Sequence, residues 1–130
     1  MRFMMLLPAP ADVLEKCAVP DKDLVLAMAK YNGEMKKEGV LLSAEGLHPT
    51  SKGTRLRISG GKPVITDGPF TESKEVIAGF WIIQVNSKEE AIEWAKRCPL
   101  PEHGLIEIRQ IFENAEFPPD LQQAKKNAGA

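Results

Sequence analysis

The chain has 130 residues, of which 43% are hydrophobic and 27% are charged, and its formal net charge is −1. These values are ordinary for one globular domain, and they argue against a nucleic-acid binder, which usually carries a basic stripe. No stretch approaches the roughly 20 apolar residues of a membrane span, and the apolar run Phe3–Leu7 is shorter than a signal-peptide core of roughly 7–15 residues. We therefore expect a cytoplasmic protein that binds neither nucleic acid nor membranes.

The first part of the chain predicts a strand, a helix and a second strand. Arg2–Leu7 is a short apolar run that ends at Pro8, which is typical of a buried strand. A loop with one helical turn at most is expected up to Pro20. A helix is then predicted over residues 21–38, with Asp21 as its N-cap and Gly39 as its stop. Its apolar residues recur at helical spacing: Leu24, Met28, Tyr31 and Met35. The second strand is predicted over Val40–Leu47.

The second part predicts a hairpin, the longest strand, another helix and a last strand. Thr54–Ser59 alternates apolar and polar residues, and Gly60-Gly61 suits a two-residue turn before Pro63–Thr66. Val76–Val85 reads as the strongest strand. The remaining expectations are a helix that starts at Ser87 with the S-x-x-E capping pattern, a strand within Gly104–Phe112, and a polar tail. We divide the chain into a domain of residues 1–112 and a tail of residues 113–130.

This order of elements predicts an α+β, ferredoxin-like split βαβ sandwich with an extra hairpin strand. Two helices can cover only one face of its antiparallel sheet. Strand Val76–Val85, however, is apolar on both faces, with Ile77, Gly79, Trp81 and Ile83 on one and Val76, Ala78, Phe80 and Ile82 on the other. A sheet with one solvated face would alternate apolar and polar residues. We therefore expect a second copy of the chain to cover the other face in a two-fold homodimer.

The sequence contains no recognisable metal or cofactor motif. Cys17 and Cys98 are far apart and match no metal or redox spacing, so we expect free thiols, with a disulfide as the alternative. The two histidines are isolated, and Gly60-Gly61 lacks the strand and helix that flank a phosphate loop. We expect neither a metal nor a cofactor.

The segment from Leu41 to Pro99 resembles the YCII-related family, in its branch with a DGPF motif. The resemblance rests on Asp67-Gly68-Pro69-Phe70, on Lys74-Glu75 and on the aromatic strand at Gly79-Phe80-Trp81, and it extends over residues 2–112. It implies a ferredoxin-like fold that pairs into a dimeric α/β barrel. Relatives by fold include isomerases, small oxygenases and ligand-sensing domains, and some DGPF members are encoded near extracytoplasmic-function sigma factors, so the resemblance does not fix the reaction.

Asp67 and His48 are the candidate catalytic residues. The wider superfamily often carries a histidine on the first helix that pairs with the turn aspartate, but residues 21–38 here contain none. Asp67 cannot bond to the backbone two residues on, because Pro69 has no N–H. It either locks the turn through the Phe70 N–H or Thr71, or acts as a general acid or base. His48 either bonds to backbone or orients Asp67 for proton transfer.

Three further residues are candidate ligand contacts: Tyr31, Arg57 and Phe70. Tyr31 is the polar aromatic residue of the first helix, and Arg57 can bind an anionic group with two hydrogen bonds or form a cross-strand ion pair. Two functions remain open. One is a small cofactor-free enzyme that acts on a small, partly apolar molecule through Asp67 and His48. The other is a non-catalytic module that binds a small ligand or serves a regulatory role.

Overall fold

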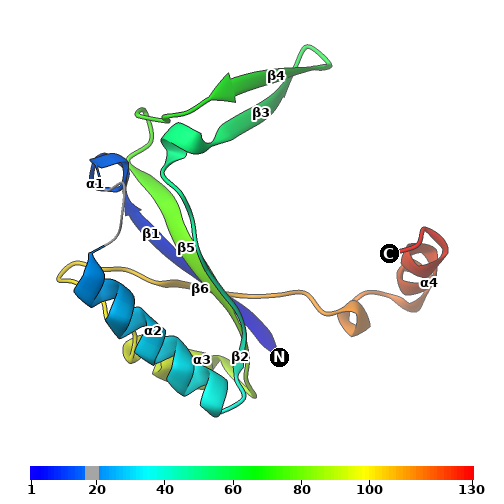
Figure 1. Ribbon diagram of the computed structural model, residues 1–130. Coiled ribbons are helices and arrows are strands. Elements are labelled where there is room, and N and C mark those ends of the chain that lie inside the picture. The colour runs from blue at the N-terminus through cyan, green and yellow to red at the C-terminus, as the bar shows by residue number, and fades with distance from the viewer. Residues whose placement is uncertain (17–20) are drawn as a thin grey trace.

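A computed structural model describes residues 1–16 and 21–130 of the chain. Its centre is an antiparallel sheet in the order β2-β5-β1-β6 (Figure 1). The strands are β1 (Arg2–Pro10), β2 (Leu41–Gly46), β5 (Glu75–Gln84) and β6 (Glu107–Gln110). The two longest and most apolar strands, β1 and β5, lie in the middle, where both of their edges are paired. The order of elements confirms the predicted α+β, ferredoxin-like fold.

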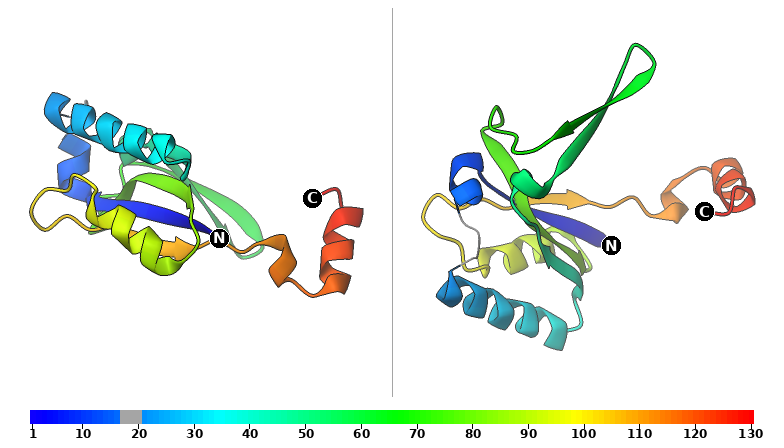
Figure 2. Two further views of the ribbon diagram at one scale, coloured as in Figure 1. Left: turned by 90° about the horizontal axis from the view of Figure 1, so that it is seen from below. Right: turned by 45° about the horizontal axis from the view of Figure 1, so that its top comes forward.

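Helices α2 (Lys22–Lys37) and α3 (Lys88–Lys96) lie together on one side of the sheet (Figures 1 and 2). Asp21 Oδ2 accepts a hydrogen bond from the Leu24 N–H at 3.1 Å, and Ser87 Oγ accepts one from the Glu90 N–H at 3.1 Å, so both predicted caps are confirmed. Gly39 ends α2 with a φ of 74°. The core between these layers includes Phe3, Met5, Tyr31, Met35, Trp81, Ile83 and Trp94.

The N-terminal strand is longer than the sequence indicated. β1 continues through Pro8 to Pro10, and α1 (Ala11–Lys16) follows it directly. The prediction that Pro8 ends the strand was wrong. The pairing of β1 with β5 shifts between Leu7 and Pro8, and this shift leaves Ala78 without a partner in the register. Such a bulge reverses the alternation of side chains, and it explains why Ile77 is exposed although Trp81 and Ile83 are buried.

The hairpin is a separate two-stranded sheet rather than an addition to the main one. Strands β3 (Thr54–Ser59) and β4 (Lys62–Asp67) follow the 3₁₀ turn η1 (Thr50–Lys52). Gly60 and Gly61 have φ angles of 59° and 77°, as a type I′ turn requires. The hairpin projects from the side of the sheet that the helices leave open (Figure 1).

The C-terminal arm, defined here as residues 112–130, leaves the sheet after β6. It contains the 3₁₀ turn η2 (Asn114–Glu116) and helix α4 (Pro119–Asn127), so the segment predicted as a polar tail includes a full helix. Its root is held by Arg2, whose guanidinium donates to both carboxylate oxygens of Glu113 at 2.8 and 3.2 Å. Beyond this root the arm stands away from the sheet (Figures 1 and 2).

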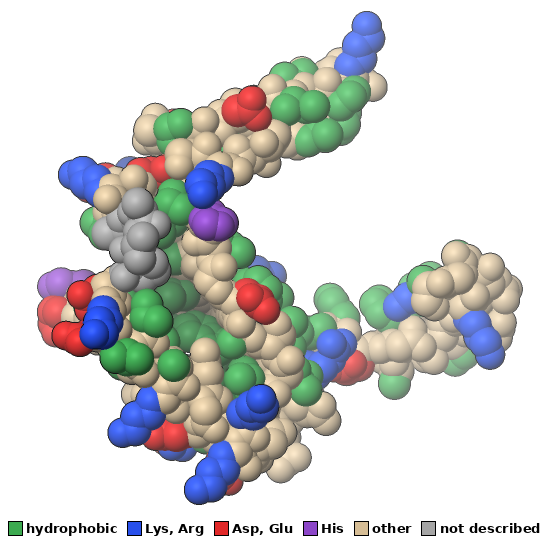
Figure 3. Space-filling model, in the orientation of Figure 1, with side chains coloured by type: hydrophobic (Ala, Val, Ile, Leu, Met, Phe, Trp, Pro, Cys, Tyr) green, Lys and Arg blue, Asp and Glu red, His purple; other side chains and the backbone are tan. Residues whose placement is uncertain are grey.

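The sheet face between the hairpin and the arm is open. Met4 pairs with Ile82 and Leu6 pairs with Phe80 on this face, and all four side chains are only partly buried. Figure 3 shows hydrophobic side chains gathered on the molecule between the two projections. The structure thus confirms that β5 carries apolar residues on both faces.

Three further expectations concern cysteines, metals and membranes. Cys98 is a buried free thiol, whereas Cys17 lies outside the described residues. The described residues contain no group of three or more His, Cys, Asp or Glu side chains that could hold a metal ion. Within residues 1–16 and 21–130, no helix has the length and apolar character needed to cross a membrane.

Candidate functional site

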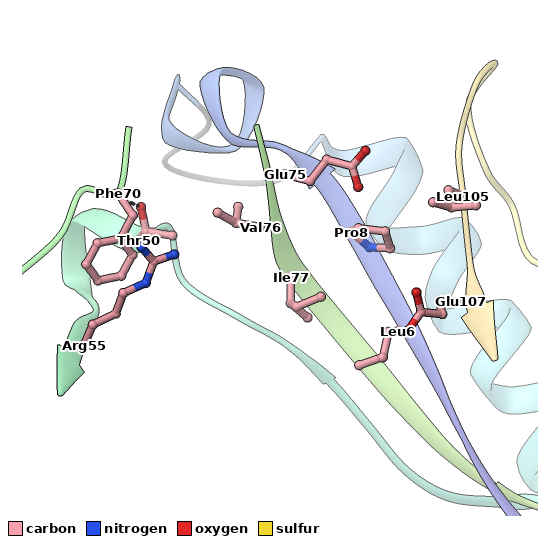
Figure 4. Close-up of a pocket in the computed structure, with 10 residues that line it drawn as sticks. All are labelled: Leu6, Pro8, Thr50, Arg55, Phe70, Glu75, Val76, Ile77, Leu105 and Glu107. Atoms are coloured by element: carbon pink, nitrogen blue, oxygen red, sulfur yellow. Dashed lines mark hydrogen bonds between the residues drawn. The ribbon is translucent and has the colours of Figure 1, made fainter. Parts of the chain in front are cut away.

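A cavity of about 440 Å³ lies between the base of the hairpin and the open sheet face. Its floor comes from β1, β5 and the segment that leads into β6, and its opposite wall comes from η1, β3 and the turn after β4 (Figure 4). The volume suits a small molecule. The residues that line it are Leu6, Pro8, Thr50, Arg55, Phe70, Glu75, Val76, Ile77, Leu105 and Glu107.

The turn at Gly68-Pro69-Phe70 is packed against η1. The Gly68 N–H donates to the Gly53 carbonyl at 2.9 Å, and the Phe70 N–H donates to Thr50 Oγ1 at 3.1 Å. A Cβ atom on Gly68 would lie 1.6 Å from the Thr50 carbonyl oxygen, so only glycine fits there. The close approach places Phe70 at the cavity wall, where the residue is 7% exposed.

Glu15 on α1 fastens η1 to the body of the protein. Its carboxylate accepts hydrogen bonds from the Thr50 N–H at 2.7 Å, from the Ser51 N–H at 3.2 Å and from the Thr50 hydroxyl. The hydrogen bond from the Thr50 side chain, more than any other contact, holds the pKa of Glu15 below its usual value. The chain of contacts therefore runs from Glu15 through Thr50 to Phe70, and it positions one wall of the cavity.

Arg55 covers the ring of Phe70 with its guanidinium carbon 3.9 Å from the ring centroid. Its two terminal nitrogens donate to Glu72 Oε1 at 2.7 Å and to Ser73 Oγ at 3.0 Å. The residues after the DGPF motif thus hold the guanidinium in place. Arg57, a candidate ligand contact or cross-strand ion-pair partner from the sequence, lies two residues further along β3 opposite Val64 and is not among the residues that line the cavity.

Asp67 lies at the end of β4, directly opposite Thr54 of β3. Its Oδ1 accepts a hydrogen bond from the Thr54 hydroxyl at 3.1 Å. Asp67 therefore bonds to a nearby side chain and not to the Phe70 N–H, which donates to Thr50 instead. Asp67 is exposed and closes the base of the hairpin.

The other candidates are not brought together. His48 is exposed, and no hydrogen bond or ion pair joins it to Asp67. Tyr31 is 3% exposed in the core, where its hydroxyl donates to the Trp94 carbonyl at 2.6 Å and its ring meets Trp81 edge-on. The main effect on the pKa of Tyr31 is burial, which raises it above the ordinary value of a phenol. Of the predicted site residues, Phe70 lines the cavity.

Sequence reasoning missed several residues of the site. Glu15 was assigned to a loop, and no local pattern connects it to Thr50, which lies 35 positions away. The pairing of Arg55 with Glu72 was equally hidden, although the alternation of Thr54–Ser59 placed Arg55 and Arg57 on the same strand face. Glu107 lies in the strand predicted within Gly104–Phe112, and nothing in that pattern marks it as a cavity residue.

The cavity joins an apolar floor to charged groups at its rim. Leu6, Pro8, Ile77 and Leu105 offer apolar surface, whereas the charged lining residues are Arg55, Glu75 and Glu107. Arg55 is already engaged with Glu72 at 2.7 Å, and Glu107 has only a long contact of 3.7 Å to Arg109. The arrangement can therefore hold a small molecule that has an apolar body and a group that donates hydrogen bonds or carries positive charge.

Comparison with known proteins identifies a family and a relative of this chain. The model of the YCII-related domain matches residues 1–115. The chain is also 33% identical over 101 residues to an uncharacterized protein of Rhizobium meliloti (strain 1021), a match that covers 75% of this chain and 78% of that protein.

Proposed function

The chain belongs to the YCII-related family, and from this premise we propose that it is a homodimeric module, of the DGPF branch, that binds a small molecule in the cavity below the hairpin. The observation that carries the proposal is the cavity itself: about 440 Å³, apolar at its floor and charged at its rim. The ligand is a small, partly apolar molecule, and we place the module in the cytoplasm.

The charges of the cavity select the ligand. Glu75 and Glu107 project at the rim (Figure 4), and both are exposed. Among the described lining residues Arg55 is the one cation, and two of its N–H groups already donate to Glu72 and Ser73. A cationic or donor-rich ligand would gain from both carboxylates, whereas an anion would be repelled by them. The ligand we propose carries an amine or a similar donor on an apolar body.

The surface area of the chain supports the dimer. The accessible surface is 9462 Å², whereas a compact monomer of 14.3 kDa exposes about 6,800 Å². The excess of roughly 2,700 Å² exceeds the about 800 Å² per partner that a standard interface buries. The open sheet face contributes Phe80 and Ile82 to this excess, and a second copy would cover them as the sheet of a two-fold partner.

Two substitutions test the dimer. Phe80→Glu places a charge on the open sheet face, and burying this charge in a dimer would be costly. We expect light scattering at micromolar concentration to show a folded monomer for this variant. The matched control is Leu26→Glu on α2, which is 58% exposed and should leave the dimer intact. A wild-type protein that is monomeric at this concentration would refute the dimer.

Ligand binding is tested with two probes of similar size and opposite charge, benzylamine and benzoate. We expect calorimetry or NMR to detect benzylamine and not benzoate at the same ionic strength. Glu107→Gln should weaken benzylamine binding about tenfold, whereas Glu89→Gln, which alters an exposed residue of α3 outside the cavity, should not. Equal binding of the two probes, or no effect of Glu107→Gln, would contradict the proposed selectivity.

Acid–base catalysis by Asp67 is the second candidate function. One observation favours it: within residues 1–16 and 21–130, the exposed Asp67 carboxylate accepts one side-chain hydrogen bond, from the Thr54 hydroxyl to Oδ1. The exposed carboxylate is therefore accessible to a substrate beside the turn that carries Phe70. In this scheme Asp67 removes a proton from a small carbonyl compound, the exposed His48 accepts that proton, and Phe70 at the cavity wall contacts the substrate.

The catalytic candidate is tested by the exchange of the acidic C–H protons of acetylacetone for deuterium, followed by NMR. An exchange that the wild type accelerates, and that Asp67→Asn abolishes while the melting temperature is kept, would support catalysis. Glu72→Gln provides a control carboxylate nearby. No acceleration by the wild type, or a loss of stability alone, would leave Asp67 as a structural residue of the hairpin base.

A further inference from the structure

The C-terminal arm is folded, but its own subunit does not cover its apolar surface. The Phe112 and Phe117 rings lie with centroids 5.7 Å apart, and Lys125 Nζ lies 4.2 Å from the centroid of Phe117. Within the described residues, every hydrogen bond made by residues 114–130 stays inside residues 113–130. Phe112 is 74% exposed and Leu121 is 44% exposed. A helix as short as α4 is marginal in water without tertiary packing.

The hairpin, at the other end of the sheet, also has apolar side chains that its own subunit does not cover. Leu56 pairs with Ile65 and Ile58 pairs with Pro63 on one face, and Leu56, Ile58 and Ile65 are each more than 60% exposed. An isolated two-stranded hairpin is at best marginally stable, and this one exposes most of its apolar residues. Figure 3 shows hydrophobic side chains along this projection.

The two projections leave the sheet at opposite ends of β1. The arm is bonded to Arg2, and the turn after the hairpin meets the other end, where the Ala11 N–H donates to the Lys74 carbonyl at 3.1 Å. Both project on the side of the open face (Figure 1). A two-fold rotation that covers this face and reverses the strand direction therefore brings the arm of one copy to the hairpin of the other.

We propose that the C-terminal arm of each copy packs against the β3–β4 hairpin of its partner, with Phe112, Phe117 and Leu121 on Leu56, Ile58 and Ile65. Charge favours this pairing over hairpin on hairpin. Residues 54–67 carry three basic and one acidic side chain, whereas the arm carries three acidic and two basic ones. Opposite net charges attract, and two copies of the basic hairpin would repel. The inference rests on the proposed homodimer, and it adds that the contact between arm and hairpin stabilises this dimer.

The test uses two full-length variants in a Cys17→Ser background, one with Ile58→Cys and the other with Leu121→Cys, each with a tag of different size. The two proteins are mixed, allowed to exchange subunits and treated with a short bismaleimide. We expect the cross-link between position 58 of one copy and position 121 of the other to exceed the 58–58 cross-link. Light scattering on the same samples reports whether the dimer is present.

A second variant measures the strength of the contact. Phe117→Ser with Leu121→Ser should weaken the dimer about tenfold or more, whereas Lys126→Ser, on the same helix, should not. A dimer that persists with no 58–121 cross-link and with unchanged affinity in the double variant would overturn the arm contact and leave the dimer standing. A monomeric wild type would refute both.

Discussion

Gly68 and the Thr50 carbonyl oxygen approach so closely that a Cβ atom on Gly68 would lie 1.6 Å from that oxygen. This contact joins the turn after the hairpin to η1, and the hydrogen bond from the Phe70 N–H to Thr50 Oγ1 reinforces it. The glycine of the DGPF motif is therefore required by packing against backbone, which cannot give way as a flexible side chain can.

Gly68→Ala should lower the free energy of unfolding by about 2–3 kcal/mol or more, because the added methyl forces η1 away from the turn. Urea denaturation measures the effect. Gly33→Ala on α2 is the matched control, since a Cβ there meets nothing within 4 Å and should raise stability by up to about 1 kcal/mol. Similar effects of the two substitutions would contradict the packing explanation.

Tyr31→Phe should lower the free energy of unfolding by about 0.5–1.5 kcal/mol, because it removes the hydrogen bond to the Trp94 carbonyl. That carbonyl keeps a second donor, the Arg97 N–H, so the loss stays moderate. If Tyr31 is purely structural, benzylamine affinity will not change. A weakened affinity at unchanged stability would instead restore Tyr31 as a ligand contact.

The pKa of Tyr31 also predicts how stability depends on alkaline pH. Burial raises this pKa in the folded protein above the ordinary value of 10.0, so folding favours the protonated phenol. The stabilisation is fully present below pH 10 and is lost as the pH rises through the folded pKa. Urea denaturation across alkaline pH should show this loss in the wild type, and Tyr31→Phe should show less of it.

The lowered pKa of Glu15 predicts that the protein loses stability in acid. Its pKa lies below the ordinary 4.5 because the Thr50 hydroxyl and nearby N–H groups donate to the carboxylate. A depressed pKa stabilises the fold above the unfolded value, and the effect disappears as the pH falls through the folded pKa. Glu15→Gln should reduce the acid sensitivity seen by urea denaturation below pH 4.5, whereas Glu93→Gln, an exposed residue of α3, should leave it unchanged.

Cys98 should be a slow nucleophile in the folded protein. Burial raises its pKa to about 11, so little thiolate exists near neutral pH. In a Cys17→Ser variant, we expect an aromatic disulfide reagent to modify Cys98 slowly in buffer and rapidly in urea. Rapid modification of the native protein would show that the thiol is accessible and ionised.

The sequence by itself determined the fold class and most of the elements, but not the full length of β1 or helix α4. Hydrophobic periodicity and caps placed α2 and α3, because those signals are local to a helix turn. Gly60-Gly61 specified the hairpin turn for the same reason. The two-sided apolar strand β5 indicated an open sheet face, which the structure confirms through its partly buried Phe80 and Ile82.

Only the tertiary structure decided the site. The bulge at Ala78 places Ile77 on the open face. No pattern of residues in the sequence predicts where the register between two strands shifts. The contact of Glu15 with Thr50 and that of Arg55 with Phe70 join segments that are 35 and 15 positions apart. Hydrogen bonds and ring contacts of this kind depend on three-dimensional distance, which local periodicity does not encode. For this reason the sequence predicted a residue pair, His48 and Asp67, while the fold built a cavity around Arg55, Phe70 and Glu107.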